Sequence, residues 1–314
     1  MSGPRNVDVD PPRNVDVDAS RNVDVDGLRW AVRMAGSGPA LLLLHGFTGS
    51  GRSWDGGLAA AASGLAAAAS GLAAAAIGAG FTTIAPDLPG HGGTAWRAGD
   101  PADPAHTSRA TIERSADDLP VLLRALGHDR AHVVGYSMGA RVALRLAIAH
   151  PACVARLVLE SPSAGIVDAA GRAARRAADD ALARTLERGG IAPFIDAWER
   201  TPVLAFEARL AADARATLRE IRVAHDPAGL AASLREAGQG AMEPLHRRLR
   251  RIASPTLVIV GADDPVRDRA TAVAAGIPGA RLAVIDGAGH APHLEAPAAF
   301  RRLVLDFLKE DHAA

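Results

Sequence analysis

Six short apolar runs are spaced along the chain from residue 28 onward, and segments with helical periodicity separate most of them. The runs lie at residues 40–44, 81–85, 132–135, 154–159, 256–260 and 281–285. Near-continuous apolar runs between helical segments are typical of strands that are buried on both faces of a parallel sheet. The pattern therefore predicts an α/β fold in which helices cover both faces of a mostly parallel sheet.

The alternation stops between residues 161 and 251, where the chain is rich in Ala, Arg and Leu and has no β-rich run. This composition predicts several helices inserted into the sheet topology, and we expect them to form a lid. Strand signals return after Pro255, and an amphipathic pattern at 297–309 predicts a closing helix. The expected organisation is a repeated N-terminal segment at 1–27, a core in two parts at 28–160 and 252–314, and a helical lid at 161–251.

A tandem repeat occupies the N-terminal segment. The unit RNVDVD begins at Arg5, Arg13 and Arg21, with a period of eight residues. An even period preserves the alternation of side chains along a strand. We therefore expect that any of the three copies can supply the first strand of the sheet.

A second repeat follows, in which the unit GLAAAA begins at Gly57, Gly64 and Gly71 with a period of seven residues. Seven residues advance an α-helix by about 700°, close to two full turns, so the leucines of the three units form one stripe. We expect one helix at about residues 55–79 that the repeat has lengthened.

The two repeats leave two interpretations open. Tolerated duplication would add strand copies at the edge of the sheet and lengthen one helix. Alternatively, the spare strand or the leucine stripe contacts a second copy of the chain, which would make the protein a homo-oligomer.

Composition and charge exclude several classes of protein. Of the 314 residues, 48% are hydrophobic and 22% are charged, as in ordinary globular proteins. Lys and Arg number 35 and Asp and Glu number 35, so no net charge favours nucleic acid or an anionic membrane as a partner. Cys153 is the only cysteine, and residues 1–5 lack the apolar segment of a secretory signal. We therefore expect a cytoplasmic enzyme.

One segment has the length of a membrane span but not its composition. No charged residue occurs from 56 to 86, which exceeds the ~20 residues of a transmembrane helix. The segment is mostly Ala and Gly, and it lies between two predicted strands of one sheet, which a single crossing would separate. We therefore expect no contact with a membrane.

Residues 135–139, with the sequence GYSMG, match the GxSxG motif and lie between a predicted strand and a predicted helix. A serine on this sharp turn needs small residues two positions away on each side, because larger side chains would clash in the strained backbone. Gly135 and Gly139 meet that requirement. The context predicts Ser137 as a catalytic nucleophile, against the alternative of a chance match in a glycine-rich chain.

A serine nucleophile needs an imidazole as base, and the imidazole needs a carboxylate that fixes its tautomer. Both follow in the expected order, each just past the end of a predicted strand, where open α/β sheets place their ligands. The spacing in GADD favours Asp264 as the acid, with Asp263 as the alternative. His290 on the loop after the last predicted strand is the predicted base. Its rival, His293, lies deeper in the next segment, where a packing or surface role is expected.

These motifs, with the loop sequence APDLPGHG at 85–92, resemble the α/β-hydrolase superfamily from about residue 28 to the C-terminus. The resemblance implies an oxyanion hole of two backbone N–H groups, one from Met138 after the nucleophile and one from Phe47 after an early strand. His45 is expected to brace that loop. No cluster of His, Cys or carboxylate residues has the spacing of a zinc site, so we expect no metal and no cofactor.

Further segments are similar to the 2-succinyl-6-hydroxy-2,4-cyclohexadiene-1-carboxylate synthase (MenH) family of menaquinone biosynthesis. They are HGFTGS at 45–50 with Trp54, GYSMGAR at 135–141, LESPSAG at 159–165, FIDAW at 194–198 with Pro202, and PAGLAASLR at 227–235. The resemblance implies a lyase that eliminates pyruvate from 2-succinyl-5-enolpyruvyl-6-hydroxy-3-cyclohexene-1-carboxylate, with the triad removing a proton. The chain departs from the family in its two repeats and in Ala140, where a second glycine is usual.

The substrate of that family is a small polycarboxylate, and guanidinium groups pair with carboxylates bidentately. Arg141 lies one helical turn after Ser137 and can face the same cleft. By resemblance, the other substrate-binding residues would be Arg175, Tyr136, Trp198 and Arg222. Each arginine of the lid could instead be a solvated charge, and the doublet Arg175-Arg176 leaves the first assignment open by one residue.

The same triad serves many chemistries, so other functions stay open at this point. The chain could be a serine esterase or a C–C bond hydrolase that acts on a small carboxylated substrate. A non-catalytic binding protein on this fold is a third possibility, which the intact set of serine, histidine and aspartate disfavours.

Overall fold

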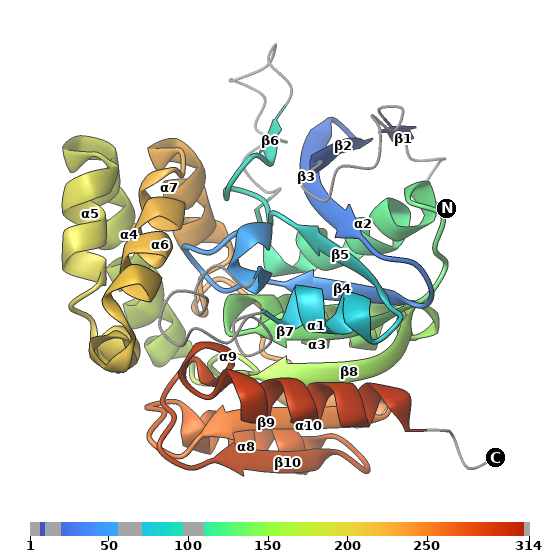
Figure 1. Cartoon of the computed structure of the whole chain (residues 1–314). Helices are drawn as coiled ribbons and strands as arrows, with labels where there is room; N and C mark the ends of the chain where they lie inside the picture. The colour runs from blue at the N-terminus through green and yellow to red at the C-terminus, as the bar shows by residue number, and fades with distance from the viewer. Residues whose placement is uncertain (1–6, 10–19, 56–70, 97–109, 311–314) are drawn as a thin grey trace.

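The computed structural model describes residues 7–9, 20–55, 71–96 and 110–310 (Figure 1). The strands are β1 (Val7–Val9), β2 (Ser20–Val25), β3 (Leu28–Ala35), β4 (Ala40–Leu44), β5 (Thr82–Pro86), β6 (Ala95–Trp96), β7 (Ala131–Tyr136), β8 (Val154–Glu160), β9 (Thr256–Gly261) and β10 (Arg281–Ile285). They form one sheet in the order β1-β2-β3-β5-β4-β7-β8-β9-β10, and β6 pairs with β3.

The sheet is parallel through most of its width. Each neighbouring pair from β5 across to β10 is parallel, whereas β1, β2 and β3 pair antiparallel at one end and β3 also meets β5 antiparallel. All six predicted apolar runs are strands, with bounds that differ from the prediction by at most one residue at either end. The predicted α/β fold with a mostly parallel sheet is confirmed.

Helices cover both faces of the sheet. They are α1 (Leu72–Gly78), α2 (Ile112–Ala125), α3 (Met138–Ala149), α4 (Ala169–Gly189), α5 (Ile191–Trp198), α6 (Ala212–Val223), α7 (Pro227–Glu236), α8 (Arg267–Gly276), α9 (Pro292–Glu295) and α10 (Pro297–Lys309). Alternate residues of β4 face opposite layers: Leu42 and Leu44 join the core under α2, α3 and α8, while Leu41 and Leu43 join the core under α1 and α10. Two apolar cores therefore hold the sheet between two helical layers.

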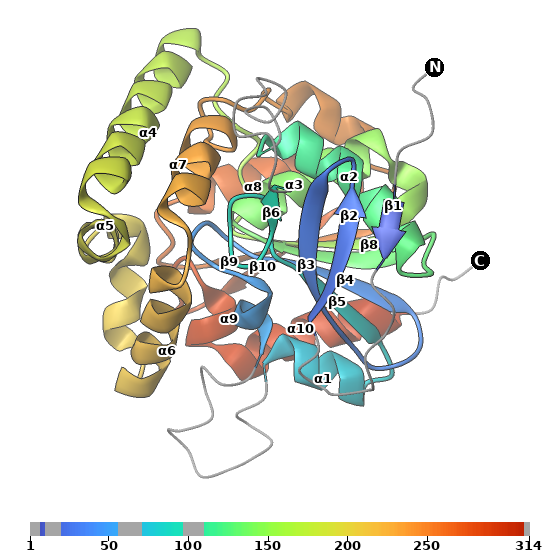
Figure 2. The same cartoon turned by 90° about the horizontal axis from the view of Figure 1, so that it is seen from above.

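The segment between β8 and β9 is helical. Helices α4 to α7 and the 3-10 helix η4 (Pro202–Arg209) fill it, and α4 packs along α7. Both views show these four helices together on one side of the sheet (Figures 1 and 2). A function as a lid stays a prediction.

A tight hairpin decides which copy of RNVDVD lies next to the core. The third copy forms β2, and the two-residue turn Asp26-Gly27 joins it to β3. Both residues have positive φ, 50° and 82°, as a type I′ hairpin turn requires. Neither of the other copies is followed by glycine. The turn therefore favours the third copy beside β3, while the first copy supplies β1. The expectation that any copy can supply the first strand stays a prediction.

The other repeat units lie partly outside the described residues. Three residues of the first RNVDVD copy form β1, which pairs antiparallel with β2 so that Val7 meets Val25 and Val9 meets Val23. The middle copy lies outside the described residues, as do the GLAAAA units that begin at Gly57 and Gly64. The third GLAAAA unit opens α1. Of the helix expected at about 55–79, the structure describes Leu72–Gly78, and Asp55 lies outside any helix.

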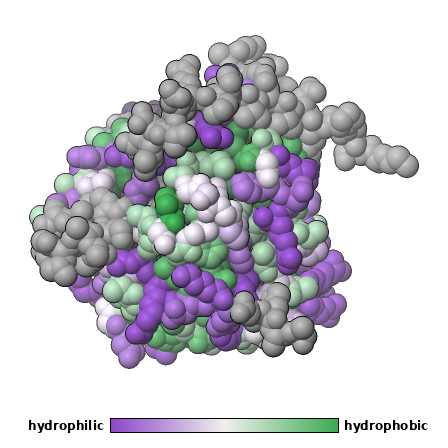
Figure 3. Space-filling model, turned by 45° about the vertical axis from the view of Figure 1, so that its right-hand side comes forward, coloured by the Kyte–Doolittle hydropathy of each residue, from purple (hydrophilic) through white to green (hydrophobic). Residues whose placement is uncertain are grey.

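No helix in the described part of the chain combines the length and apolar character needed to cross a bilayer. The face in Figure 3 carries hydrophilic residues (purple) and hydrophobic residues (green) interspersed. Such mixing is ordinary for the surface of a folded domain, where apolar atoms contribute much of the exposed area.

Candidate active site

Ser137 sits on a strained turn between β7 and α3. Its backbone has φ 50° and ψ −103°, a conformation that few non-glycine residues adopt. A Cβ atom at Gly135 would lie 2.5 Å from the carbonyl oxygen of Gly139, and one at Gly139 would collide with the carbonyl oxygen of Leu44. The close approach of β7, α3 and β4 therefore excludes side chains on both sides of the serine and projects its hydroxyl from the turn.

Three residues from distant parts of the chain form a hydrogen-bonded chain. The Oγ atom of Ser137 lies 3.0 Å from Nε2 of His290, and Nδ1 of His290 lies 3.0 and 3.1 Å from the two oxygens of Asp264. An ionised carboxylate only accepts, so Nδ1 carries the proton and Nε2 is free to accept the serine proton. This is the geometry of a nucleophile, a general base and an orienting acid.

Asp264 is the carboxylate that faces the imidazole. Burial raises its pKa, but the hydrogen bond and charge of His290 outweigh this, with further hydrogen bonds from Ser161 and the N–H of Val266, and they hold the pKa below its usual value. Asp263, the alternative acid, is exposed and lies 3.8 Å from Arg209. Of the two neighbouring aspartates, the structure brings Asp264 to His290.

The predicted oxyanion donors lie beside the serine. Met138 is the first residue of α3, so its N–H has no acceptor within the helix. Phe47 lies in the loop after β4, which His45 braces: the imidazole Nδ1 bonds the carbonyl of Gly46 at 2.8 Å, and Nε2 accepts the N–H of Leu88 at 2.8 Å. Both Phe47 and Met138 line the cavity described next.

A cavity of about 400 Å³ lies between the core and the helical insertion, which is a typical size for a small-molecule site. The predicted residues that line it are Ser137, His290, Phe47, Met138, Tyr136, Arg141, Arg175 and Trp198. One wall is aromatic, because the ring of Trp198 stacks on Phe194 at 6.1 Å and meets Phe47 edge-on at 5.2 Å. The structure thus brings Ser137, His290 and most of the predicted substrate-binding residues to one cavity.

Arg141 is a buried cation in this cavity without an ion-pair partner among the described residues. Its guanidinium donates to the carbonyl of Ala237 and contacts the sulfur of Met242 at 3.8 Å. Burial and then the charge of Arg175 lower its pKa to about 10, against the opposing effect of Asp179. At neutral pH the group therefore stays charged, and a buried charge without a counter-ion is costly until an anion reaches it.

Arg175, and not its neighbour Arg176, reaches the cavity. Its Nε donates to Asp179 at 2.8 Å, one helical turn away on α4, while Arg176 instead bonds the carbonyl of Gly240 at 3.0 Å. Asp179 is 2% exposed, and burial raises its pKa against the lowering effect of Arg175. Arg175 therefore has an ion-pair partner in Asp179, whereas Arg141 has none among the described residues.

Arg222 does not line the cavity of Ser137. Its guanidinium bonds both carboxylate oxygens of Glu207, with Nη1 2.9 Å from Oε2, and lies 3.2 Å from Glu199. The side chain is buried between α6 and η4. These carboxylates occupy the donors that a substrate would need, so the structure assigns Arg222 a place in the packing of the insertion.

Comparison with known proteins agrees with this geometry. The family model described as the alpha/beta hydrolase fold matches residues 39–297. The chain belongs to the α/β-hydrolase fold family. A Bacillus subtilis (strain 168) protein provisionally named 2-succinyl-6-hydroxy-2,4-cyclohexadiene-1-carboxylate synthase is 32% identical over 90% of this chain and 95% of its own length. The Serratia proteamaculans (strain 568) protein of that name is 30% identical over 86% and 93%. The structure of MenH from S. aureus superposes with a TM-score of 0.75 and 28% identity, covering 88% of this chain and 97% of its own.

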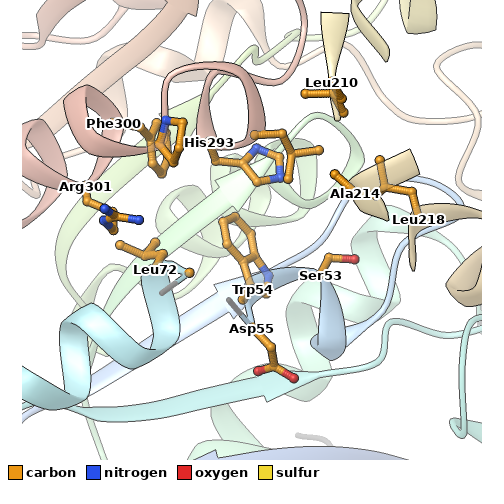
Figure 4. Close-up of a pocket in the computed structure, with 13 residues that line it drawn as sticks. Ser53, Trp54, Asp55, Leu72, Leu210, Ala214, Leu218, His293, Phe300 and Arg301 are labelled. Carbon is orange, nitrogen blue, oxygen red and sulfur yellow. The ribbon is translucent and has the colours of Figure 1, made fainter. Parts of the chain in front are cut away.

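His293, the rival base, belongs to a separate and smaller pocket of this α/β hydrolase (Figure 4). Its ring packs with Trp54 at 5.3 Å, and Nδ1 lies 2.8 Å from the buried carboxylate of Glu160. The pocket holds about 30 Å³, room for a water molecule, between Trp54, Leu218 and Phe300. The pairing with Glu160 holds His293 away from the serine, in the packing role expected for it.

Sequence reasoning missed a cluster of histidines behind the oxyanion loop of this α/β hydrolase. His45, His91 and His225 are buried, with ring centroids 5.1 and 5.4 Å apart in succession. His225 joins the insertion to the core, because Nε2 bonds the carbonyl of Thr48 at 2.9 Å and Nδ1 accepts the N–H of Gly92 at 2.8 Å. Burial lowers the pKa of all three, so they are neutral at pH 7.

No group of three or more His, Cys, Asp or Glu side chains in the described residues is arranged to hold a metal ion. The groups that this α/β hydrolase brings together at the site are a serine hydroxyl, an imidazole, a carboxylate and backbone N–H groups.

Proposed function

We propose that this protein is a 2-succinyl-6-hydroxy-2,4-cyclohexadiene-1-carboxylate synthase, a lyase of menaquinone biosynthesis. Its substrate would be 2-succinyl-5-enolpyruvyl-6-hydroxy-3-cyclohexene-1-carboxylate, from which it would eliminate pyruvate. The observation that carries the proposal is Arg141, a buried guanidinium that lies in the same cavity as Ser137 and has no ion-pair partner among the described residues. The names of the similar proteins support the same reaction.

The charges of the cavity favour an anionic substrate. Arg141 is a buried cation without an ion-pair partner in the described part of the chain, and Arg175 has guanidinium donors besides the one that Asp179 accepts. The buried guanidinium of Arg141 has lost its hydration, and a bound carboxylate would supply charge-assisted hydrogen bonds in its place. Such bonds are about twice as strong as hydrogen bonds between neutral groups. An ester with an uncharged acyl group would leave this cation unpaired. A polycarboxylate therefore fits the cavity better than a simple ester does.

The triad would act as a base in this reaction. His290 takes the proton of Ser137, and the serine oxygen removes the proton on the ring carbon next to the succinyl carbonyl. The electrons pass into the carbonyl, whose oxygen accepts hydrogen bonds from the N–H groups of Phe47 and Met138. They then return to form a double bond between ring carbons 2 and 3, the original double bond moves from carbons 3 and 4 to carbons 4 and 5, and the C–O bond between carbon 5 and the enolpyruvyl group breaks. The leaving group takes up a proton and becomes pyruvate.

Pyruvate release tests the proposal. The purified protein is given the enolpyruvyl substrate, generated enzymatically because it decomposes slowly by itself. We expect rapid release with the wild type and release at the rate of the enzyme-free blank with Ser137→Ala. Circular dichroism of the variant checks that its fold is intact.

The outcome also separates the alternatives. Wild-type release at the background rate, together with Ser137-dependent hydrolysis of short-chain esters, would overturn the lyase proposal in favour of an esterase. Full activity of Ser137→Ala would remove the serine from the mechanism.

A further inference from the structure

One cavity arginine was not anticipated from the motifs. Arg269 lies on the first turn of α8 and lines the cavity of Ser137, where its exposed side chain marks the opening to solvent. Its Nη1 donates to Oε1 of Gln239 at 2.9 Å, and it forms no ion pair with any residue in the described ranges. Gln239 lines the same cavity from the turn that follows α7.

The turn at residues 237–240 holds two arginines at once. The carbonyl of Ala237 accepts from Arg141 of α3, and the side chain of Gln239 accepts from Arg269 of α8. One guanidinium group is therefore held by the backbone of this turn and the other by a side chain of the same turn, and both line the cavity of Ser137.

The position of this turn is itself constrained. Gly238 packs against Asp179 of α4, and a Cβ atom there would collide with Oδ2 of that carboxylate. Helix α4 is therefore in direct contact with the backbone of the turn. Arg141 and Arg269 each donate one hydrogen bond from Nη1 to this turn. A guanidinium has five N–H donors, so several in each group stay available for a ligand.

We propose that Arg269 and Gln239 form a second carboxylate-binding subsite, which acts with Arg141 to clamp two carboxylates of the same substrate. The identity of the substrate in this inference rests on the proposed function, whereas the subsite itself does not. A guanidinium held by one hydrogen bond is pre-oriented, so it can take a carboxylate in the bidentate geometry with little further ordering. The subsite would select dicarboxylates and tricarboxylates over monocarboxylates.

The test uses the full-length protein and the variant Arg269→Gln. Its matched control is Arg267→Gln, since Arg267 is exposed on the same helix and does not line the cavity. Binding of tricarballylate, a tricarboxylate probe, is measured by titration calorimetry at constant ionic strength, because exposed charges are screened by salt. Pyruvate release then gives kcat and KM for each variant.

We expect Arg269→Gln to weaken tricarballylate binding and to raise KM by about tenfold, with kcat within about twofold of the wild type. Arg267→Gln should change neither. Equal behaviour of the two variants in both assays would overturn the subsite, even if pyruvate release is rapid. Conversely, Arg269-dependent tricarballylate binding without any pyruvate release would uphold the subsite and refute the proposed reaction.

Discussion

Replacing Arg222 with methionine should destabilise the helical insertion and leave substrate binding intact. The side chains of Arg222 and Glu207 are 6% and 9% exposed, and the guanidinium bonds both carboxylate oxygens. Glu199, the second partner, also binds Arg219 at 2.8 Å and would keep that contact. Arg222→Met therefore leaves one carboxylate, that of Glu207, buried without its cation.

The expected loss is large. Removing one partner of a buried ion pair costs about 3–5 kcal/mol, and in a domain of this size each kcal/mol lowers Tm by about 2–4 °C. We therefore expect Tm to fall by roughly 10 °C. The double variant Arg222→Met/Glu207→Leu should recover most of this loss, because it removes both buried charges and keeps the volume apolar.

Thermal unfolding followed by circular dichroism and by tryptophan fluorescence measures the effect, since Trp198 lies in the insertion. The kinetics of pyruvate release, measured below Tm, complete the assay. An unchanged Tm with a KM raised tenfold or more would refute the reasoning and return Arg222 to the substrate site. A double variant less stable than Arg222→Met would refute the account of the buried pair.

Three further outcomes are expected. Arg141→Ala should lower kcat/KM for the polycarboxylate by about 10- to 100-fold, because it removes charge-assisted hydrogen bonds; an unchanged kcat/KM would exclude Arg141 from the site. Gly139→Ala should lower both Tm and kcat, since its Cβ would collide with the carbonyl of Leu44, and wild-type values for both would contradict the packing of the serine turn. Acid should destabilise the protein through His45, whose pKa burial lowers to about 4. Between pH 6.5 and 4 His45 is protonated in the unfolded chain but neutral in the folded protein. The free energy of unfolding therefore falls as the pH falls through this window. Unfolding in urea at pH 7 and pH 5 measures this loss, and equal midpoints would contradict it.

Local patterns were sufficient to predict the sheet and the positions of the triad. The apolar runs that became β4, β7 and β9 are short and continuous because both faces of the sheet are covered. The glycines around Ser137 mark its turn, because backbone atoms of other elements approach them too closely for a side chain. Asp264 and His290 follow strand ends, so strand order alone places them at one edge. In each case the signal lies within a few residues of the feature.

Partners far apart in the sequence carry no such signal. Arg141 bonds a carbonyl 96 positions away, and His225 bonds one that is 177 positions away. Nothing near Arg222 in the sequence shows that its partner is Glu207 and not a ligand, because that choice depends on how the insertion helices pack together. The same holds for Arg269, whose helix is recognisable but whose place at the cavity follows from the turn after α7.

Because of the Asp26-Gly27 turn, the repeated N-terminus can vary in length, which a strand in the middle of the sheet could not do. The two-residue loop of the hairpin sets the register of β2 against β3, and the described part of the first copy, Val7–Val9, pairs only with β2 at the outer edge of the sheet. Gain or loss of whole eight-residue units would thus shift the length of the N-terminus and leave the alignment of every strand beyond the hairpin unchanged.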